Sequence, residues 1–459
     1  MGAKDSDTRN RWWLVAATGL AVFMAQLDVT IVNVALPTIE HDFGTSTSLT
    51  EWIVLGYVLP LIALSLPSGR WLDRVGRREA LAFAITGFAA ASVAAGLAPR
   101  IEWLLAARAV QGAFAAALLA LVPVLTTIAV RPEMRGRAMA VVMTLGPLGG
   151  VAGPGLGGLI VESLGWAWIF FLNVPAGALV LAISWRQLDR GERLRLPDRA
   201  WAAETALLGT AAAVVMLALS LGASGGPAWL LLALAAVPFV LAWWRLPAGR
   251  PVRELIAVPG MPGPHLALLA EMAAVMALQF LIPFHLLRGG VPPAATGLTM
   301  LALPIGIMVA GLAGGVLCDR WGARATAVRG LAVLVLALAS FDLLGFDAGW
   351  GPAELIGPLA LVGVGAGLFA GPNQTLAMSL SPPHLLGTTG ASTSLARQLG
   401  VALGPALATI TWSMSDYRFE GMRMTIGTAA VLTVLSLAAL LVRSPSSRTR
   451  LPQRTSDKV

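Results

Sequence analysis

Long apolar runs alternate along the chain with short polar connections. Each run is about 20 residues long, the length at which an α-helix crosses the hydrocarbon core of a bilayer. Counting the runs predicts fourteen membrane helices, near residues 12–36, 49–71, 79–98, 102–129, 137–162, 165–186, 200–222, 227–246, 264–288, 294–317, 323–345, 352–377, 385–414 and 424–442. The pattern therefore predicts an all-α membrane protein.

One polar connection occurs twice. Between the second and third predicted helices the chain carries glycine, aspartate and arginine at Gly69, Asp73, Arg74, Gly76 and Arg78. The same residue types return 246 residues later at Gly315, Asp319, Arg320, Gly322 and Arg324, again between two predicted helices. This repeat indicates an internal duplication, as in transporters whose two halves rock around a central site. We expect each copy to latch one conformation, with its aspartate pairing with basic groups or facing a helix N-terminus.

The duplication defines the predicted domains. The halves align when the first six helices are matched with the last six, so the two helices between them are an insertion of low polarity. The predicted units are an N-terminal tail (1–11), a six-helix bundle (12–186), a connector (187–199), two inserted helices (200–246), a second connector (247–263), a second six-helix bundle (264–442) and a tail (443–459).

Composition and charge agree with a membrane protein. With 57% hydrophobic and 12% charged residues, the chain has too few polar side chains to cover a water-soluble globule. The net charge of +8 comes from arginines spread over many short loops, which argues against nucleic-acid binding and places both termini in the cytoplasm. Cys318 is the only cysteine and the four histidines are scattered, so neither a disulfide nor a metal or cofactor site is expected.

Small residues gather on the fifth predicted helix, at Gly149, Gly153, Pro154, Gly157 and Gly158. Such residues let two helix backbones approach closely, and a proline bends its helix. A partial copy, Gly400, Gly404 and Pro405, lies on the thirteenth helix. The pattern predicts a kinked contact surface in each half, although close packing without a functional role would produce it too.

Asp28 and Arg108 are charged residues inside predicted membrane helices, both in the outer half of the bilayer. A lone charge there costs about 2.5–3.5 kcal/mol on insertion scales, so each needs a partner, a cavity or, for the acid, a proton. We expect the two to pair. The pair is either a proton or cation site or a purely structural ion pair.

Glu271, in the inner half of the ninth helix, is the second candidate acid of the proton-coupling or cation site. Arg397 on the thirteenth helix is its expected partner across the cavity, and an ion-paired structural role is the alternative. Further candidates for the cavity wall are the polar residues Asn33, Gln111 and Gln279, together with Arg397.

Four of these segments together resemble the major facilitator superfamily, in its fourteen-helix drug:proton antiporter branch (EmrB/QacA type). Gly69–Arg78 resembles the superfamily's loop motif, and Leu27–Pro37 resembles the helix-one signature of that branch. Arg108, Gln111 and Gly112 resemble the helix-four motif associated with proton coupling, and Gly149–Gly158 resembles the helix-five antiporter motif. The resemblance covers essentially the whole chain and implies two six-helix bundles plus two inserted helices.

The function that the resemblance implies is proton-coupled efflux, by alternating access, of hydrophobic drug-like compounds, cations among them. The chain contains no G-x-x-x-x-G-K-[ST] motif, so we expect an ion gradient to supply the energy and expect no enzymatic activity. The expected partners are a small hydrophobic substrate, protons and lipid. The expected state is a monomer in a bacterial inner membrane. Two alternatives stay open: a dedicated exporter of one endogenous metabolite, antibiotic or lipid, and a membrane sensor that does not transport.

Overall fold

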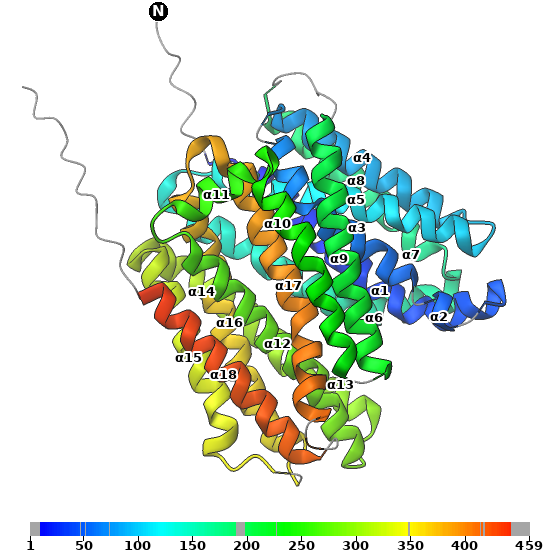
Figure 1. Cartoon of the computed structure of the whole chain (residues 1–459), viewed down its shortest axis with the longest axis vertical. Coiled ribbons are helices and arrows are strands. Elements are labelled where there is room, and N and C mark those ends of the chain that lie inside the picture. The colour runs from blue at the N-terminus through cyan, green and yellow to red at the C-terminus, as the bar shows by residue number, and fades with distance from the viewer. Residues whose placement is uncertain are drawn as a thin grey trace, which may run out of the picture.

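The computed structural model describes residues 10–45, 47–50, 52–72, 74–189, 198–225, 227–347, 349–413, 415 and 418–441. Within these ranges every regular element is a helix (Figure 1). Asp73, most of the predicted connector 187–199 and the tail 443–459 lie outside the described residues. The fold is all-α.

The helices of the first predicted bundle follow one another closely. Their bounds are α1 Trp12–Phe43, α2 Thr47–Thr50, α3 Trp52–Leu72, α4 Arg77–Gly96, α5 Ile101–Ala129, α6 Arg135–Leu164, α7 Trp168–Phe171 and α8 Asn173–Gln187, with a 3-10 turn at Pro132–Met134 before α6. The long α1 ends at Gly44, whose φ of 59° is the left-handed conformation that favours glycine, and Thr45 N–H closes the last turn on the Glu40 carbonyl.

The second bundle is formed by α12 Pro262–Arg288, α13 Pro293–Met300, α14 Ala302–Trp321, α15 Ala323–Leu343, α16 Pro352–Leu380, α17 Leu386–Ser413 and α18 Phe419–Leu441, with a 3-10 turn at Pro383–Leu385. Between the bundles lie α9 Arg199–Gly225, a 3-10 helix Pro227–Ala236, α10 Val237–Arg245, a 3-10 turn Pro247–Gly249 and α11 Arg250–Ala257. The predicted connector 247–263 therefore contains a short helix, α11, which buries Val252 and Leu255 and exposes Glu254.

Ten of the described helical segments are long and apolar enough to cross a membrane, or up to eleven if the bent pair Leu231–Arg245 and Pro247–Ala257 is one span. The long helices α6, α9 and α17 are not among the ten. The predicted span 227–246 begins as a 3-10 helix rather than as an α-helix. A multi-pass membrane fold is thus evident, and the number fourteen stays a prediction.

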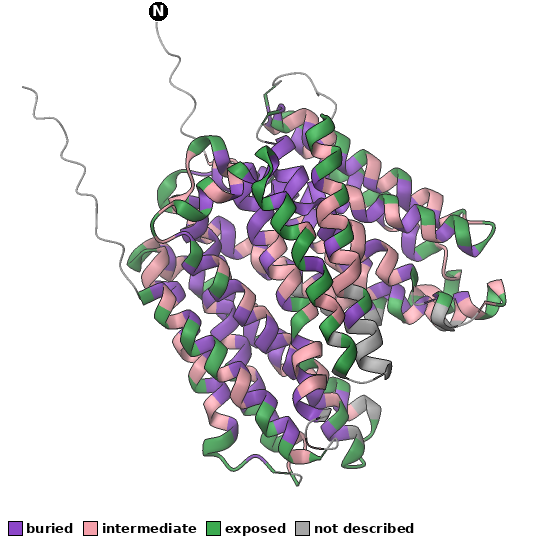
Figure 2. Cartoon of the chain, in the orientation of Figure 1, coloured by how far each residue is buried: buried purple, intermediate pink, exposed green. Residues whose placement is uncertain are grey.

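Each bundle has its own apolar core, and buried residues line the sides that face neighbouring helices (Figure 2). In the first bundle Leu118, Phe88 and Tyr57 are buried; in the second, Leu334, Phe341 and Phe369 are. Many large apolar side chains on the outside are exposed, among them Leu231, Leu298 and Leu435. Apolar side chains exposed on so many helices fit a surface that meets lipid.

Candidate functional site

The two bundles meet closely at the end of the molecule that carries the loop between α3 and α4. A Cβ on Gly69 of α3 would overlap Ala391 of α17 and lie 2.6 Å from the carbonyl oxygen of Gly387. A Cβ on Gly390 would likewise lie 2.5 Å from the Ala120 carbonyl oxygen on α5. At the other end, α2 and α13 lie far apart (Figure 1). The structure is therefore closed at the loop end.

Asp319, the aspartate of the second loop copy, joins the bundles at this closed end. Its Oδ1 accepts a hydrogen bond of 2.9 Å from the Gly136 N–H in the first turn of α6, and its Oδ2 lies 3.2 Å from Arg137 Nε. A carboxylate at a helix N-terminus also interacts favourably with the helix dipole. The contacts expected of a latch aspartate are thus present at Asp319. Arg320 is exposed.

The first loop copy contacts the inserted helices instead. Arg70 Nη2 lies 3.0 Å from Glu204 Oε2 on α9, and Arg74 Nη1 lies 3.3 Å from Asp198 Oδ2. Glu204 is 1% exposed and also accepts a hydrogen bond of 2.9 Å from Trp243 Nε1 on α10. Asp73 lies outside the described residues, so its predicted latch role stays a prediction. The buried ion pair fastens α9 and α10 to the loop end of α3.

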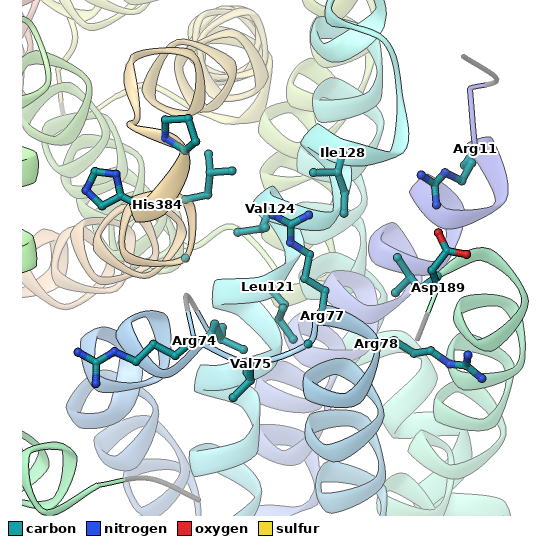
Figure 3. Close-up of a pocket in the computed structure, with 16 residues that line it drawn as sticks. Arg11, Arg74, Val75, Arg77, Arg78, Leu121, Val124, Ile128, Asp189 and His384 are labelled. Carbon is teal, nitrogen blue, oxygen red and sulfur yellow. The ribbon is translucent and has the colours of Figure 1, made fainter. Parts of the chain in front are cut away.

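A pocket of about 500 Å³ lies beside this loop, where the basic side chains spread apart (Figure 3). Arg78 stacks 4.0 Å over the Trp185 ring, and Arg11 donates a hydrogen bond of 2.7 Å to the Gln187 carbonyl. Gly76 has an ordinary φ of −61° at the start of α4, whereas its counterpart Gly322 has φ 86°. The turn itself therefore requires glycine in the second copy only, while Gly69 is required for close approach.

Glu204→Gln is expected to destabilise the protein strongly. The change leaves Arg70, whose side chain is 9% exposed, without its buried carboxylate, and breaking a buried pair in this way costs about 3–5 kcal/mol. Thermal unfolding of the purified protein measures the effect. Asp198→Asn is the matched control, because Asp198 is 51% exposed and its pairs should contribute under about 1 kcal/mol. Equal melting temperatures for both variants would contradict the proposed anchor.

The glycines of the fifth predicted helix pack α6 against α1. A Cβ on Gly153 would overlap Thr30 and lie 2.9 Å from the Ile31 nitrogen, and one on Gly149 would overlap the Phe23 carbonyl. Gly157 meets Ile31, whereas a Cβ on Gly158 would have no atom within 4 Å. The side chain of Pro154 is not described. The partial copy on α17 packs closely against α12 in the same way. A Cβ on Gly404 would overlap Met276 and the Ala273 carbonyl.

Asp28 and Arg108 form the predicted pair, at the centre of a buried polar network. Arg108 Nη1 lies 2.5 Å from Asp28 Oδ2 and donates a further hydrogen bond of 2.7 Å to Gln111 Oε1. Gln111 Nε2 in turn donates a hydrogen bond of 2.9 Å to Asp28 Oδ1. The side chains of Asp28 and Arg108 are both 0% exposed. The pair is therefore sealed inside the first bundle in this conformation.

Three members of this network were not foreseen from the sequence. Asn173 on α8 donates a hydrogen bond of 2.8 Å to Asp28 Oδ1. The Ser92 hydroxyl on α4 accepts hydrogen bonds from both Asn173 and Gln111. The Tyr57 ring lies 4.3 Å from the Arg108 guanidinium carbon. Arg108 Nη2 and the Tyr57 hydroxyl have no hydrogen-bond partner among the described residues. The one signal in the sequence was Asn173, whose side-chain amide lies in the middle of a largely apolar predicted span.

A cavity of about 330 Å³ lies between the bundles. Both bundles contribute apolar residues to its wall, among them Val29, Val122, Met276 and Ile307. Its polar residues are Gln26, Thr30, Gln279, Gln374, Thr393, Ser394, Arg397 and Gln398. None of the lining residues comes from the described part of α9 or α10. The size and the mostly apolar lining suit one small organic molecule.

The structure brings some of the predicted cavity residues to this wall and not others. Gln279 and Arg397 line it. Gln111 lies in the Asp28 network, and Asn33 is exposed on α1 and is not among the lining residues. Glu271 is 0% exposed, and neither of its carboxylate oxygens has a hydrogen-bond partner among the described residues. It interacts electrostatically with Arg397, but neither oxygen is hydrogen-bonded to the described Arg397 guanidinium.

Comparison with known proteins agrees with this geometry. A family model described as Major Facilitator Superfamily matches residues 18–405. The chain is 31% identical over 401 residues to the drug efflux pump JefA of Mycobacterium tuberculosis (strain ATCC 25618 / H37Rv), covering 85% of this chain and 78% of that protein. It is 32% identical over 413 residues to the puromycin resistance protein pur8 of Streptomyces alboniger, covering 86% of this chain and 81% of that protein.

A solved structure shares the fold. The crystal structure of the human organic anion transporter MFSD10 (TETRAN) superposes with a TM-score of 0.68 and covers 94% of this chain and 100% of that one. The sequence identity is 17%, so the likeness concerns the fold alone.

Proposed function

Because the chain belongs to the major facilitator superfamily, we propose that it exports hydrophobic drug-like compounds in exchange for protons, by alternating access of the central cavity. Its relatives include drug efflux proteins, which supports efflux as the direction of transport. The observation that carries the proposal is the cavity itself. It lies between two bundles that are closed at one end and apart at the other.

The orientation follows from the distribution of charge. Arg70, Arg74, Arg77 and Arg78 lie at the closed end, and arginine-rich short loops remain on the cytoplasmic side of membranes. We therefore place both termini and the closed end in the cytoplasm, with the protein in a bacterial inner membrane. In this orientation the conformation is outward-open, and the fourteen-helix antiporter branch is the subfamily we propose.

Asp28 is our proposed proton-coupling residue. Protonation would remove the negative charge that Arg108, Gln111 and Asn173 hold in place. Proton binding would therefore loosen contacts that join α1 to α5 and α8, and α1 is the helix that also lines the cavity at Gln26 and Thr30. Such an arrangement links a proton to a rearrangement of the first bundle without a direct contact between the proton and the substrate.

Inside-out vesicles from a host without its own efflux pumps test the proposal. With a pH gradient imposed, vesicles holding the protein should accumulate fluorescent drugs, and a protonophore should abolish the accumulation. Removing ATP while the gradient is held should have no effect. Accumulation that survives the protonophore would refute proton coupling, and absence of flux for a broad drug panel would favour a non-transporting role.

A dedicated exporter of one antibiotic or metabolite is the second candidate. It is favoured by the puromycin resistance relative, whose name refers to a single compound. The same panel separates the two candidates, because a dedicated exporter would accumulate one compound and its close analogues only.

A further inference from the structure

The formal charge in the described wall of the central cavity is positive only. Among the described residues that line it, Arg397 on α17 is the charged one. The two acids proposed for the proton-coupling or cation site, Asp28 and Glu271, are 1% and 0% exposed and lie inside their bundles. A compound in this cavity would therefore meet a cationic side chain and no carboxylate.

The Arg397 guanidinium has N–H groups that are not used in strong hydrogen bonds to described residues. Its hydrogen bonds to described residues go to two thioether sulfurs, Nη1 to Met272 Sδ and Nη2 to Met143 Sδ, each at 3.6 Å. Thioether sulfur is a weak acceptor, whereas a guanidinium presents five N–H groups that match two carboxylate oxygens. Met272 belongs to the second bundle and Met143 to the first, so the guanidinium lies at the junction of the two.

Glu271 does not occupy these donors. Its two oxygens lack hydrogen-bond partners among the described residues, and its ion pairing with Arg397 is not observed. Glu271 lies on α12 directly before Met272, which faces the cavity. Glu271 thus leaves the Arg397 N–H groups without a hydrogen bond to a described carboxylate, on a residue that lines the cavity.

We propose that the cavity binds drug-sized organic anions, in which an apolar or aromatic body carries a carboxylate or a similarly acidic oxygen that Arg397 holds. The inference rests on the proposed efflux function and narrows its substrates. The apolar wall receives the body of the ligand, and Gln26, Gln279 and Gln398 offer amide groups to its other polar atoms. A cationic compound is disfavoured, because Arg397 repels it and the described wall offers no acid in compensation.

Two dyes with the same three-ring xanthene body test the proposal on the purified full chain. Fluorescein is an anion at pH 7.4 and rhodamine 123 is a cation, so fluorescence anisotropy compares the charge of nearly matched ligands. Fluorescein should bind at least about tenfold more tightly than rhodamine 123. Equal affinities, tighter binding of rhodamine 123, or no detectable binding of fluorescein would overturn the proposal.

Variants then test whether Arg397 causes the preference for the anionic dye. Arg397→Gln should weaken fluorescein binding roughly 10- to 100-fold, as expected for loss of a hydrogen bond to a charged group, and should leave rhodamine 123 no weaker. Arg397→Lys retains the charge and should restore part of the loss. Arg423→Gln is the matched control, because Arg423 is 52% exposed and pairs with Asp342 away from the cavity. Unchanged fluorescein affinity in Arg397→Gln would exclude this residue as the anchor.

Flux in inside-out vesicles separates this inference from the proposed function. Tight fluorescein binding without proton-driven accumulation would refute the efflux mechanism and leave the anion site intact. Proton-driven accumulation of rhodamine 123 but not of fluorescein would support efflux and refute the anion site.

Discussion

Asp28→Asn is expected to abolish proton-driven transport of every substrate while the protein still reaches the membrane. The substitution removes the charge that pairs with Arg108 Nη1 at 2.5 Å, in a site where both side chains are 0% exposed. An unpaired buried arginine costs about 3–5 kcal/mol, so a lower melting temperature should accompany the loss of transport. Proton-driven flux in inside-out vesicles, at matched protein amounts, measures the main effect.

A second readout distinguishes proton coupling from a structural role. In proteoliposomes without a pH gradient, exchange of labelled for unlabelled substrate requires binding and rocking but no net proton movement. Asp28→Asn should retain this exchange. Asp342→Asn removes an exposed acid paired with Arg423 at 3.0 Å and should change neither assay. Loss of exchange together with flux would make Asp28–Arg108 a structural ion pair, and full flux would remove Asp28 from the mechanism.

Gly153→Leu is expected to eliminate transport and to destabilise the first bundle. Even the Cβ of a new side chain would overlap Thr30 and approach the Ile31 nitrogen within 2.9 Å, so α6 and α1 would have to separate. Thr30 is two residues from Asp28 and lines the cavity, and the separation would disturb both. Overpacking of this kind typically costs about 1–3 kcal/mol. The melting temperature and the vesicle flux measure the two consequences.

Gly158→Leu is the matched control on the same helix. A Cβ at Gly158 would meet no atom within 4 Å, so a leucine there should leave stability and flux near those of the unmodified protein. If both substitutions are equally harmful, the defect is general to α6. If neither is harmful, close packing of α6 on α1 is unimportant for the transport cycle.

Much of the fold follows from local features of the sequence and could therefore be predicted. Apolar length alone predicts membrane helices, and the repeated loop at Gly69 and Gly315 indicates two related bundles. The pairing of Asp28 with Arg108 was also predictable, because a charge inside a membrane helix needs a partner and few were available. Polar residues of ordinary types, such as Asn173 and Ser92, gave a much weaker signal than charges did.

The roles of the inserted helices and of the loop required the tertiary structure. The inserted helices were expected to be of low polarity, yet Glu204 near the start of α9 is the buried partner of Arg70. Asp319 was expected to pair with basic groups or to face a helix N-terminus, but only the structure identifies that N-terminus as the first turn of α6. Sequence spacing places such residues on a helix but does not say which distant helix end they meet.

The sequence by itself determined that this chain spans a membrane as two related helical bundles with charged residues inside them. Only the tertiary structure decided which charges face the cavity, where Arg397 lines the wall while Asp28 and Glu271 are buried behind it. The physical reason is that a helix fixes the angle between its own side chains but not its rotation about its axis. That rotation is set by packing against neighbours, here through close contacts such as that of Gly153 on α6 with α1 and that of Gly404 on α17 with α12.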